Sequence, residues 1–157
     1  MNNKAKLDYI VNLHKKNSDN LGFIPKPFLE KLVDNGQFFL SKDGGLESGY
    51  CIVGNGKNSN LIIYQHCIEI DLRRLTHGKL LFKEVEHYAK NKGYDSVTLR
   101  CRENLQANKF WKALNFINYG FEAKVTKRTK KGINKWIYLI QNPKQFQLFR
   151  INYGKQI

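Results

Sequence analysis

The sequence predicts an α/β fold in which helices flank a mixed, mostly antiparallel sheet. The first observation is the order of the apolar segments, which have the spacing of two helices, three strands, a helix, a strand, a helix and two strands. The second is the helical segment 76–92, which lies between a strand that ends at Ile68 and a strand that starts at Val97. Such a crossover makes the two strands parallel neighbours. At 157 residues, the chain is expected to form one domain over residues 1–157.

In the first half of the chain, the pattern of apolar residues predicts two helices and a three-stranded antiparallel meander. The first helix spans Lys4 to Lys16, and the second begins near Pro27, which suits a first helical turn, and stops at Gly36. Strands are expected at 37–41, 49–53 and 61–68, with turns rich in glycine and asparagine between them.

In the second half of the chain, the same kind of pattern predicts a helix that stops at Gly93 and a strand at 97–101. A further helix is expected to begin near Asn104 and to end at Asn115-Phe116. Strands at 116–126 and 136–141 then flank a basic turn, while residues 142–157 have no clear period.

Composition limits the class of protein. No apolar run has the length of a membrane helix, and the N-terminus lacks the apolar core of a signal peptide, so a cytoplasmic protein without membrane contact is expected. Cys51, Cys67 and Cys101 lie far apart within predicted strands. We therefore expect reduced, mostly buried thiols and no metal.

Positive charge is concentrated in the last third of the chain. The formal net charge is +14, and residues 104–157 hold eleven Lys and Arg residues but one acid, Glu122. The segment 124–135 alone has six bases and no acid. This cluster has two possible interpretations. It is either a solvated hairpin that maintains solubility or a surface that binds a polyanion such as nucleic acid.

The polar turn after the third predicted strand has the features of an anion site. The residues Arg73-Arg-Leu-Thr-His-Gly78 lead from a strand into a helix, whose first N–H groups and positive dipole end face the turn. Arg73, Arg74 and Lys79 add full positive charge, so the turn suits a pyrophosphate.

Two motifs resemble those of the GNAT superfamily of acyl-coenzyme A-dependent N-acyltransferases. The turn Arg73 to Gly78 is similar to the family's Arg/Gln-x-x-Gly-x-Gly/Ala loop, with Thr76 in place of the first glycine. The segment Asn104-Leu-Gln-Ala-Asn-Lys-Phe-Trp111 is similar to Asn-x-x-Ala-x-x-Phe-Tyr, with Trp111 in place of tyrosine, and Asn115-Phe116 takes the place of Gly-Phe. Both motifs occur in the family's order on strand–turn–helix segments.

The resemblance implies a GNAT-like sheet whose central parallel strands splay apart, with acetyl-CoA as the acyl donor. It implies that the main chain of Ile68 and Ile70 pairs with the cofactor. Asn104 would cap its helix and contact the cofactor, although a cap alone is the alternative. For Arg73 the alternative is an ion pair with Asp71. The cofactor-binding residues that the resemblance implies are Ile68, Ile70, Arg73, Arg74, Thr76, His77, Gly78, Lys79, Asn104, Ala107, Phe110 and Trp111.

The implied reaction is direct attack of an amine on the thioester. Glu69, at the end of the strand, is the first candidate for the base and His66 the second. The alternative for Glu69 is an ion pair, for example with Arg102. Trp111 cannot supply the proton that the family's tyrosine gives to the leaving thiol.

The acceptor is left open by the sequence. Phe23, in the loop between the first two helices, would border the acceptor site, and Lys127, Arg128, Lys130 and Lys131 would contact an acidic acceptor or nucleic acid. The alternatives are a GNAT-like protein that modifies or binds DNA or tRNA, and a module that has lost its chemistry. The protein is expected to be a monomer or a homodimer.

Overall fold

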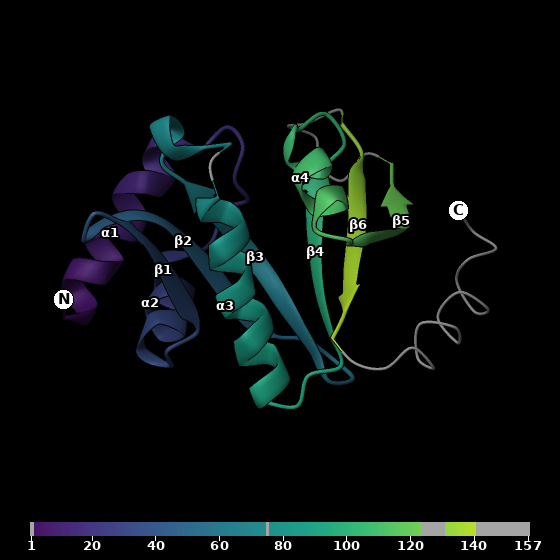
Figure 1. The fold of residues 1–157 in the computed structure, drawn as a ribbon, viewed down its shortest axis with the longest axis horizontal. Coiled ribbons are helices and arrows are strands. Elements are labelled where there is room, and N and C mark those ends of the chain that lie inside the picture. The colour runs from purple at the N-terminus through teal and green to yellow at the C-terminus, as the bar shows by residue number, and fades with distance from the viewer. Residues whose placement is uncertain (1, 75, 124–130, 141–157) are drawn as a thin grey trace. The chain divides into compact units, whose positions relative to one another are not determined.

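The computed structural model describes residues 2–74, 76–123 and 131–140. Figure 1 shows the helices and strands in order along the chain. They are α1 (Asn3–Lys16), α2 (Lys26–Asp34), β1 (Phe38–Asp43), β2 (Leu46–Asn55), β3 (Asn60–Ile68), the short 3-10 helix η1 (Ile70–Leu72), α3 (His77–Asn91), β4 (Ser96–Arg102), α4 (Ala107–Ala113), β5 (Ile117–Glu122) and β6 (Ile133–Leu139).

The predicted fold class is confirmed. The strands form one sheet in the order β1-β2-β3-β4-β6-β5. The pairs β1–β2, β4–β6 and β5–β6 are antiparallel. At the start of β3, the Asn60 side chain donates to Thr98 Oγ1 over 2.7 Å and accepts from Ser96 Oγ over 3.1 Å. Because Ser96 and Thr98 lie at the start of β4, β3 and β4 begin together and run parallel, as the crossover predicts.

The chain divides into two compact units. The first consists of Met1–Asn55 and Ile63–Tyr88, and the second of Gly56–Ile62 and Ala89–Ile157. The single domain over residues 1–157 stays a prediction.

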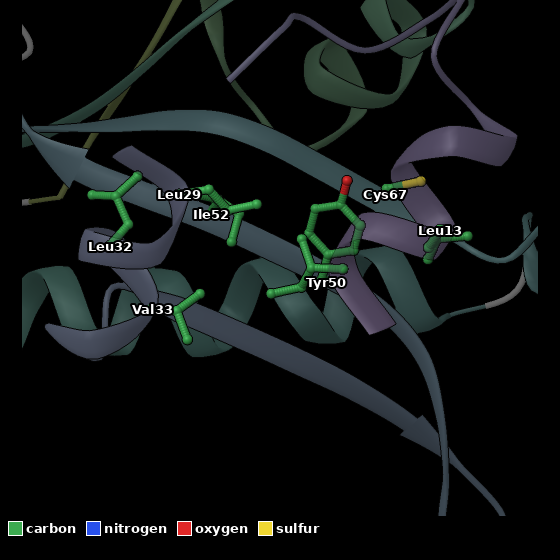
Figure 2. Close-up of a cluster of buried hydrophobic side chains, with 8 residues drawn as sticks. Leu13, Leu29, Leu32, Val33, Tyr50, Ile52 and Cys67 are labelled. Carbon is green, nitrogen blue, oxygen red and sulfur yellow. The ribbon is translucent and has the colours of Figure 1, made fainter. Parts of the chain in front are cut away.

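The core of the first unit lies between the helix pair α1 and α2 and one face of β2 and β3. Figure 2 shows apolar side chains from these four elements in one cluster. The buried members of this cluster are Ile10, Leu13, Leu29, Leu32, Val33, Tyr50, Ile52 and Cys67. Neighbouring strand residues face the opposite side of the sheet. There Phe39 of β1 packs edge-on against Tyr88 of α3, with ring centroids 5.3 Å apart.

Close approach of β2 and β3 fixes the end of β3. A Cβ atom added to Gly49 would lie 2.5 Å from both the Cys67 carbonyl oxygen and Ile68 Cδ1, so only glycine fits there. One residue earlier on β2, the Ser48 carbonyl accepts a hydrogen bond from the Glu69 N–H over 2.9 Å. The backbone that leads into the polar turn is therefore held firmly against β2.

All three cysteines are buried and free, as predicted. Burial raises the pKa of the Cys67 and Cys101 thiols to about 11 and raises that of Cys51 further. These thiols are therefore protonated at neutral pH and unsuited to nucleophilic attack. Within the described part of the chain, no helix has the length and apolarity needed to cross a bilayer.

Candidate functional site

The turn between β3 and α3 ends in an open helix N-terminus. The Thr76 carbonyl accepts the first helical hydrogen bond, from the Leu80 N–H over 2.9 Å. The N–H groups of His77, Gly78 and Lys79 consequently have no partner within the helix. Since α3 has 15 residues, its dipole places partial positive charge at these groups.

Positive side chains lie around this helix start. Arg74 and Lys79 are exposed, as is Thr76, whereas Gly78 is buried. Arg74 has a φ of 66°, in the left-handed region that non-glycine residues rarely adopt. The turn therefore combines N–H donors and two accessible cations, a donor set that suits a phosphate group.

Arg73 has defined partners inside the first unit. Its Nε donates to the Ile68 carbonyl over 3.0 Å, and a terminal N–H of its guanidinium donates to Asn17 Oδ1. Asn17 in turn caps α1, where its Nδ2 donates to the Leu13 carbonyl over 2.9 Å. Arg73 thus ties the end of β3 to the end of α1.

The carbonyl groups of Ile68 and Ile70 both accept hydrogen bonds from Arg73. The Ile68 carbonyl binds Arg73 Nε, and the Ile70 carbonyl accepts from the Arg73 backbone N–H over 3.3 Å. If these two residues pair with a cofactor, they do so through their N–H groups or by displacing Arg73. The Ile70 side chain is 69% exposed.

The two predicted bases contact different helices. Glu69 lies 3.9 Å from the Lys16 ammonium on α1, and 28% of its side chain is exposed. His66 Nε2 lies 3.1 Å from the Gly78 carbonyl oxygen, in the first turn of α3. Burial lowers the pKa of His66 to about 4, against weaker opposing effects of hydrogen bonds to backbone groups. Of the two, Glu69 is the accessible carboxylate, while His66 is a neutral ring anchored to a helix.

A buried polar network in the first unit was not foreseen from the sequence. The Tyr50 hydroxyl donates to Gln65 Oε1 over 2.8 Å, and Gln65 Nε2 contacts both His14 Nδ1 and the Gly22 carbonyl. This network holds the loop between α1 and α2, in which Phe23 is 84% exposed. The signal of it in the sequence is the alternating pattern of β3, which places polar Gln65 on the same buried face as Ile63 and Cys67.

The turn between β4 and α4, in the second unit, corrects one prediction. Asn104 is exposed and does not cap the helix, because α4 begins at Ala107 with Gln106 in the cap position. Asn108 organises the turn instead. Its Nδ2 donates to the carbonyls of Arg102, Glu103 and Leu105, and its Oδ1 accepts from Asn134 and from the indole of Trp136.

The remaining residues of the second motif range from exposed to buried. Ala107 is exposed, Phe110 is half-buried and Trp111 is 5% exposed. The Trp111 ring packs edge-on against Phe110 and Phe116, at centroid distances of 4.9 and 5.1 Å. Trp111 is therefore a core residue of its unit.

Comparison with solved structures identifies the fold. Ard1 from Thermoplasma volcanium superposes with a TM-score of 0.76 at 13% identity, over 90% of this chain and 95% of that one. A Desulfovibrio desulfuricans protein named as an acetyltransferase of the GNAT family gives 0.64 at 14% identity, over 82% and 91%. This chain has the GNAT fold. No protein-family model and no curated protein matches the sequence.

A third GNAT-fold structure contains the expected donor. A Bacillus anthracis protein named as a streptothricin acetyltransferase was solved in complex with acetyl coenzyme A. It superposes with a TM-score of 0.62 at 20% identity, over 65% of this chain and 61% of that one. At these identities the comparisons establish the fold, and activity is a separate question.

The structure explains two departures from the GNAT motifs. Asn115 stands where glycine is usual, and its φ of 66° is one that asparagine tolerates better than other side chains. Thr76 also replaces a glycine, and among the described residues of that turn the positive φ belongs to Arg74. Neither substitution therefore prevents the local fold.

The predicted basic surface lies mostly outside the described residues. Lys127, Arg128 and Lys130 belong to that part, while Lys131 is described and exposed. At the base of the hairpin, Glu122 pairs with Lys135 at 2.7 Å and with Arg100. The hydrogen bond from Lys135 is the main cause of a lowered pKa of Glu122. Among the described residues, no cluster of His, Cys, Asp and Glu could hold a metal ion.

Proposed function

We propose that this protein is an acyl-CoA-dependent N-acyltransferase that uses acetyl-CoA. The observation that carries the proposal is the open N-terminus of α3 beside exposed Arg74 and Lys79, at the end of β3 in a GNAT fold. The acetyltransferase names of two of the structural neighbours, and the acetyl-CoA bound to one of them, support it.

The donor set of the turn fits the pyrophosphate of CoA. The N–H groups of His77, Gly78 and Lys79 would donate hydrogen bonds to phosphate oxygens, and Arg74 and Lys79 would neutralise the phosphate charge. Arg73 supports the turn from within, through Ile68 and Asn17. From the second motif, Asn104, Ala107, Phe110 and Trp111 remain proposed cofactor-side residues. When bound, acyl-CoA supplies the acyl group as a thioester.

Glu69 is the proposed base. When acyl-CoA is bound, Glu69 would remove a proton from the acceptor amine, directly or through a water molecule, so that the amine nitrogen could attack the acyl carbon and CoA could leave as its thiolate. Its partly exposed carboxylate and its loose contact with Lys16 leave it accessible. His66 is poorly suited to this step because its Nε2 lies 3.1 Å from the Gly78 carbonyl oxygen, which anchors the ring to the first turn of α3.

The acceptor is proposed to reach the loop between α1 and α2. Phe23 offers an apolar surface there, held in place by the Gln65 contact to Gly22. The basic residues Lys127, Arg128, Lys130 and Lys131 would favour an acidic acceptor. None of the comparisons supports action on nucleic acid, so we do not advance that alternative.

An activity assay on Glu69 tests the proposal. Thiol release from acetyl-CoA would be followed with a panel of peptide, polyamine and aminoglycoside acceptors. Glu69→Gln should lower kcat by about 100-fold or more, as expected for loss of a general base. Glu84→Gln, an exposed carboxylate in the middle of α3, is the matched control and should keep full activity. Equal activity of wild type and Glu69→Gln would contradict the assignment.

A further inference from the structure

His66 makes a contact that catalysis by a base would not require. Its Nε2 lies 3.1 Å from the Gly78 carbonyl oxygen, and the two residues are joined across the turn between β3 and α3. A carbonyl oxygen can only accept a hydrogen bond, so Nε2 must carry the proton. In the neutral ring, Nδ1 is then the unprotonated nitrogen.

The Gly78 carbonyl belongs to the same peptide group as the Lys79 N–H. That N–H is one of the three at the start of α3 without a partner inside the helix. A hydrogen bond accepted by a carbonyl polarises its peptide group and strengthens the donor at the other end. The imidazole of His66 therefore acts, through one peptide bond, on a donor of the proposed anion site.

The His66 contact also fixes the position of this peptide. Gly78 is buried and carries no side chain that could anchor the first turn of α3. At the neighbouring residue, the contact between His77 Nε2 and Asp43 Oδ1 is longer, at 3.9 Å. Among the described residues, His66 thus provides the short polar link between β3 and the helix start.

We propose that His66 is a positioning residue of the anion-binding turn, whose Nε2–H orients and polarises the Gly78–Lys79 peptide toward a pyrophosphate. This proposal rests on the proposed function, because it assigns a role within the same cofactor site. It replaces the role of base that the sequence suggested for His66. Burial keeps the ring neutral at physiological pH, since its pKa is lowered to about 4.

Two substitutions separate the roles of base and positioning residue. Gln places an amide N–H near the position of Nε2 and cannot act as a base, whereas Leu has neither donor nor base. We expect His66→Gln to bind CoA within about threefold of wild type, and His66→Leu to bind it roughly five- to tenfold more weakly, as the loss of one hydrogen bond predicts. With acetyl-CoA as substrate, KM should rise for His66→Leu and kcat should hold for both.

The opposite pattern would overturn the proposal. If both variants lose kcat by about 100-fold while KM is unchanged, His66 is a base. If His66→Leu binds CoA as tightly as wild type, the contact with Gly78 has no role in the turn. Should His66→Leu fail to fold, NMR of wild type and His66→Gln decides, because a proton on Nδ1 of neutral His66 would contradict the assignment.

The same NMR samples separate this inference from the proposed function. Inorganic pyrophosphate added to wild type should shift the Lys79 amide resonance, and the shift should persist in His66→Gln. If wild type binds pyrophosphate in this way but not CoA, the proposed function fails while the role of His66 is supported. If neither ligand shifts the Lys79 amide, both proposals are wrong.

Discussion

The two strand–turn–helix segments of this chain have the same order of elements, but different contacts hold their turns in place. After β3, the side chains of Arg73 and His66 hold the turn from the strand side, and the helix N–H groups are left open. After β4, the Asn108 side chain occupies the turn itself, where its Nδ2 contacts three carbonyl groups. The helices differ too, since α3 has 15 residues and α4 has seven.

This difference decides which of the two turns has N–H groups available for an anion. A long helix with an open start and nearby cations has donors available for an anion. A short helix adds little dipole, and in the turn after β4 the N–H groups of Leu105, Asn108 and Lys109 donate to carbonyl groups of the turn itself. We therefore assign the pyrophosphate to the turn after β3 and a structural role to Asn108.

The first prediction concerns the turn between β4 and α4, which the Asn108 side chain holds together. Asn108→Ala removes both ends of a network that joins β4, α4 and β6, and leaves the Trp136 indole N–H without this acceptor. We expect a loss of about 2–4 kcal/mol in the free energy of unfolding, measured by urea titration. Asn104→Ala, four residues earlier and exposed, is the control and should change it by less than about 0.5 kcal/mol. Similar losses in the two variants would remove the distinction between these asparagines.

The second prediction concerns His66, the half-buried histidine of β3 that contacts the start of α3. The pKa of His66 is about 4 in the folded protein and 6.5 in the unfolded chain, so between these values the unfolded chain binds more protons. The stability that comes from neutral His66 is present above pH 6.5 and is lost as pH falls toward 4. We expect this term to be about 1–3 kcal/mol.

Unfolding of wild type and His66→Gln should therefore be compared between pH 7 and 4. The variant cannot titrate at position 66, so its stability should fall less over this range. Parallel curves would show that the pKa of His66 is not lowered in the folded state.

The third prediction compares the two ends of α3. Lys79 lies in the first turn and Lys90 in the last, and both are exposed. Lys79→Gln should weaken acetyl-CoA binding by roughly fivefold, whereas Lys90→Gln should have no effect, because charge contacts at exposed sites act over a short range. Competition binding at low and high salt provides the measurement. An equal effect at both ends would point to general charge attraction instead of a site at the helix start.

Much of the fold could be predicted from the sequence because periodicity reports local structure directly. The apolar face of α1, the meander and the crossover all follow from residues close together in the chain. The start of α4 was misjudged because Asn104 matched a motif, while the residue that fixes the turn is Asn108. Its acceptors and donors include Asn134 and Trp136, which are 26 and 28 residues away in the chain.

The candidate site was predictable in position but less so in the roles of its residues. Charge and glycine at the turn 73–79 indicated an anion site without a structure. The partners of Arg73 and His66 depend on tertiary contacts, with Asn17 56 residues away and Gly78 twelve. No spacing rule distinguishes a histidine that accepts a proton from one that donates to a carbonyl.

The central claim is that acyl-CoA binds at the turn between β3 and α3, and titration calorimetry with acetyl-CoA tests it most directly. Wild type should bind with a dissociation constant on the order of micromolar, as needed at ordinary substrate levels. Gly78→Glu places bulk and negative charge at a buried position of the helix start and should abolish binding, while Lys90→Gln, with the same change of one charge at the other end of α3, should bind normally. Folding of each variant would be checked by circular dichroism. Equal acetyl-CoA affinity of wild type and a folded Gly78→Glu variant would contradict the account.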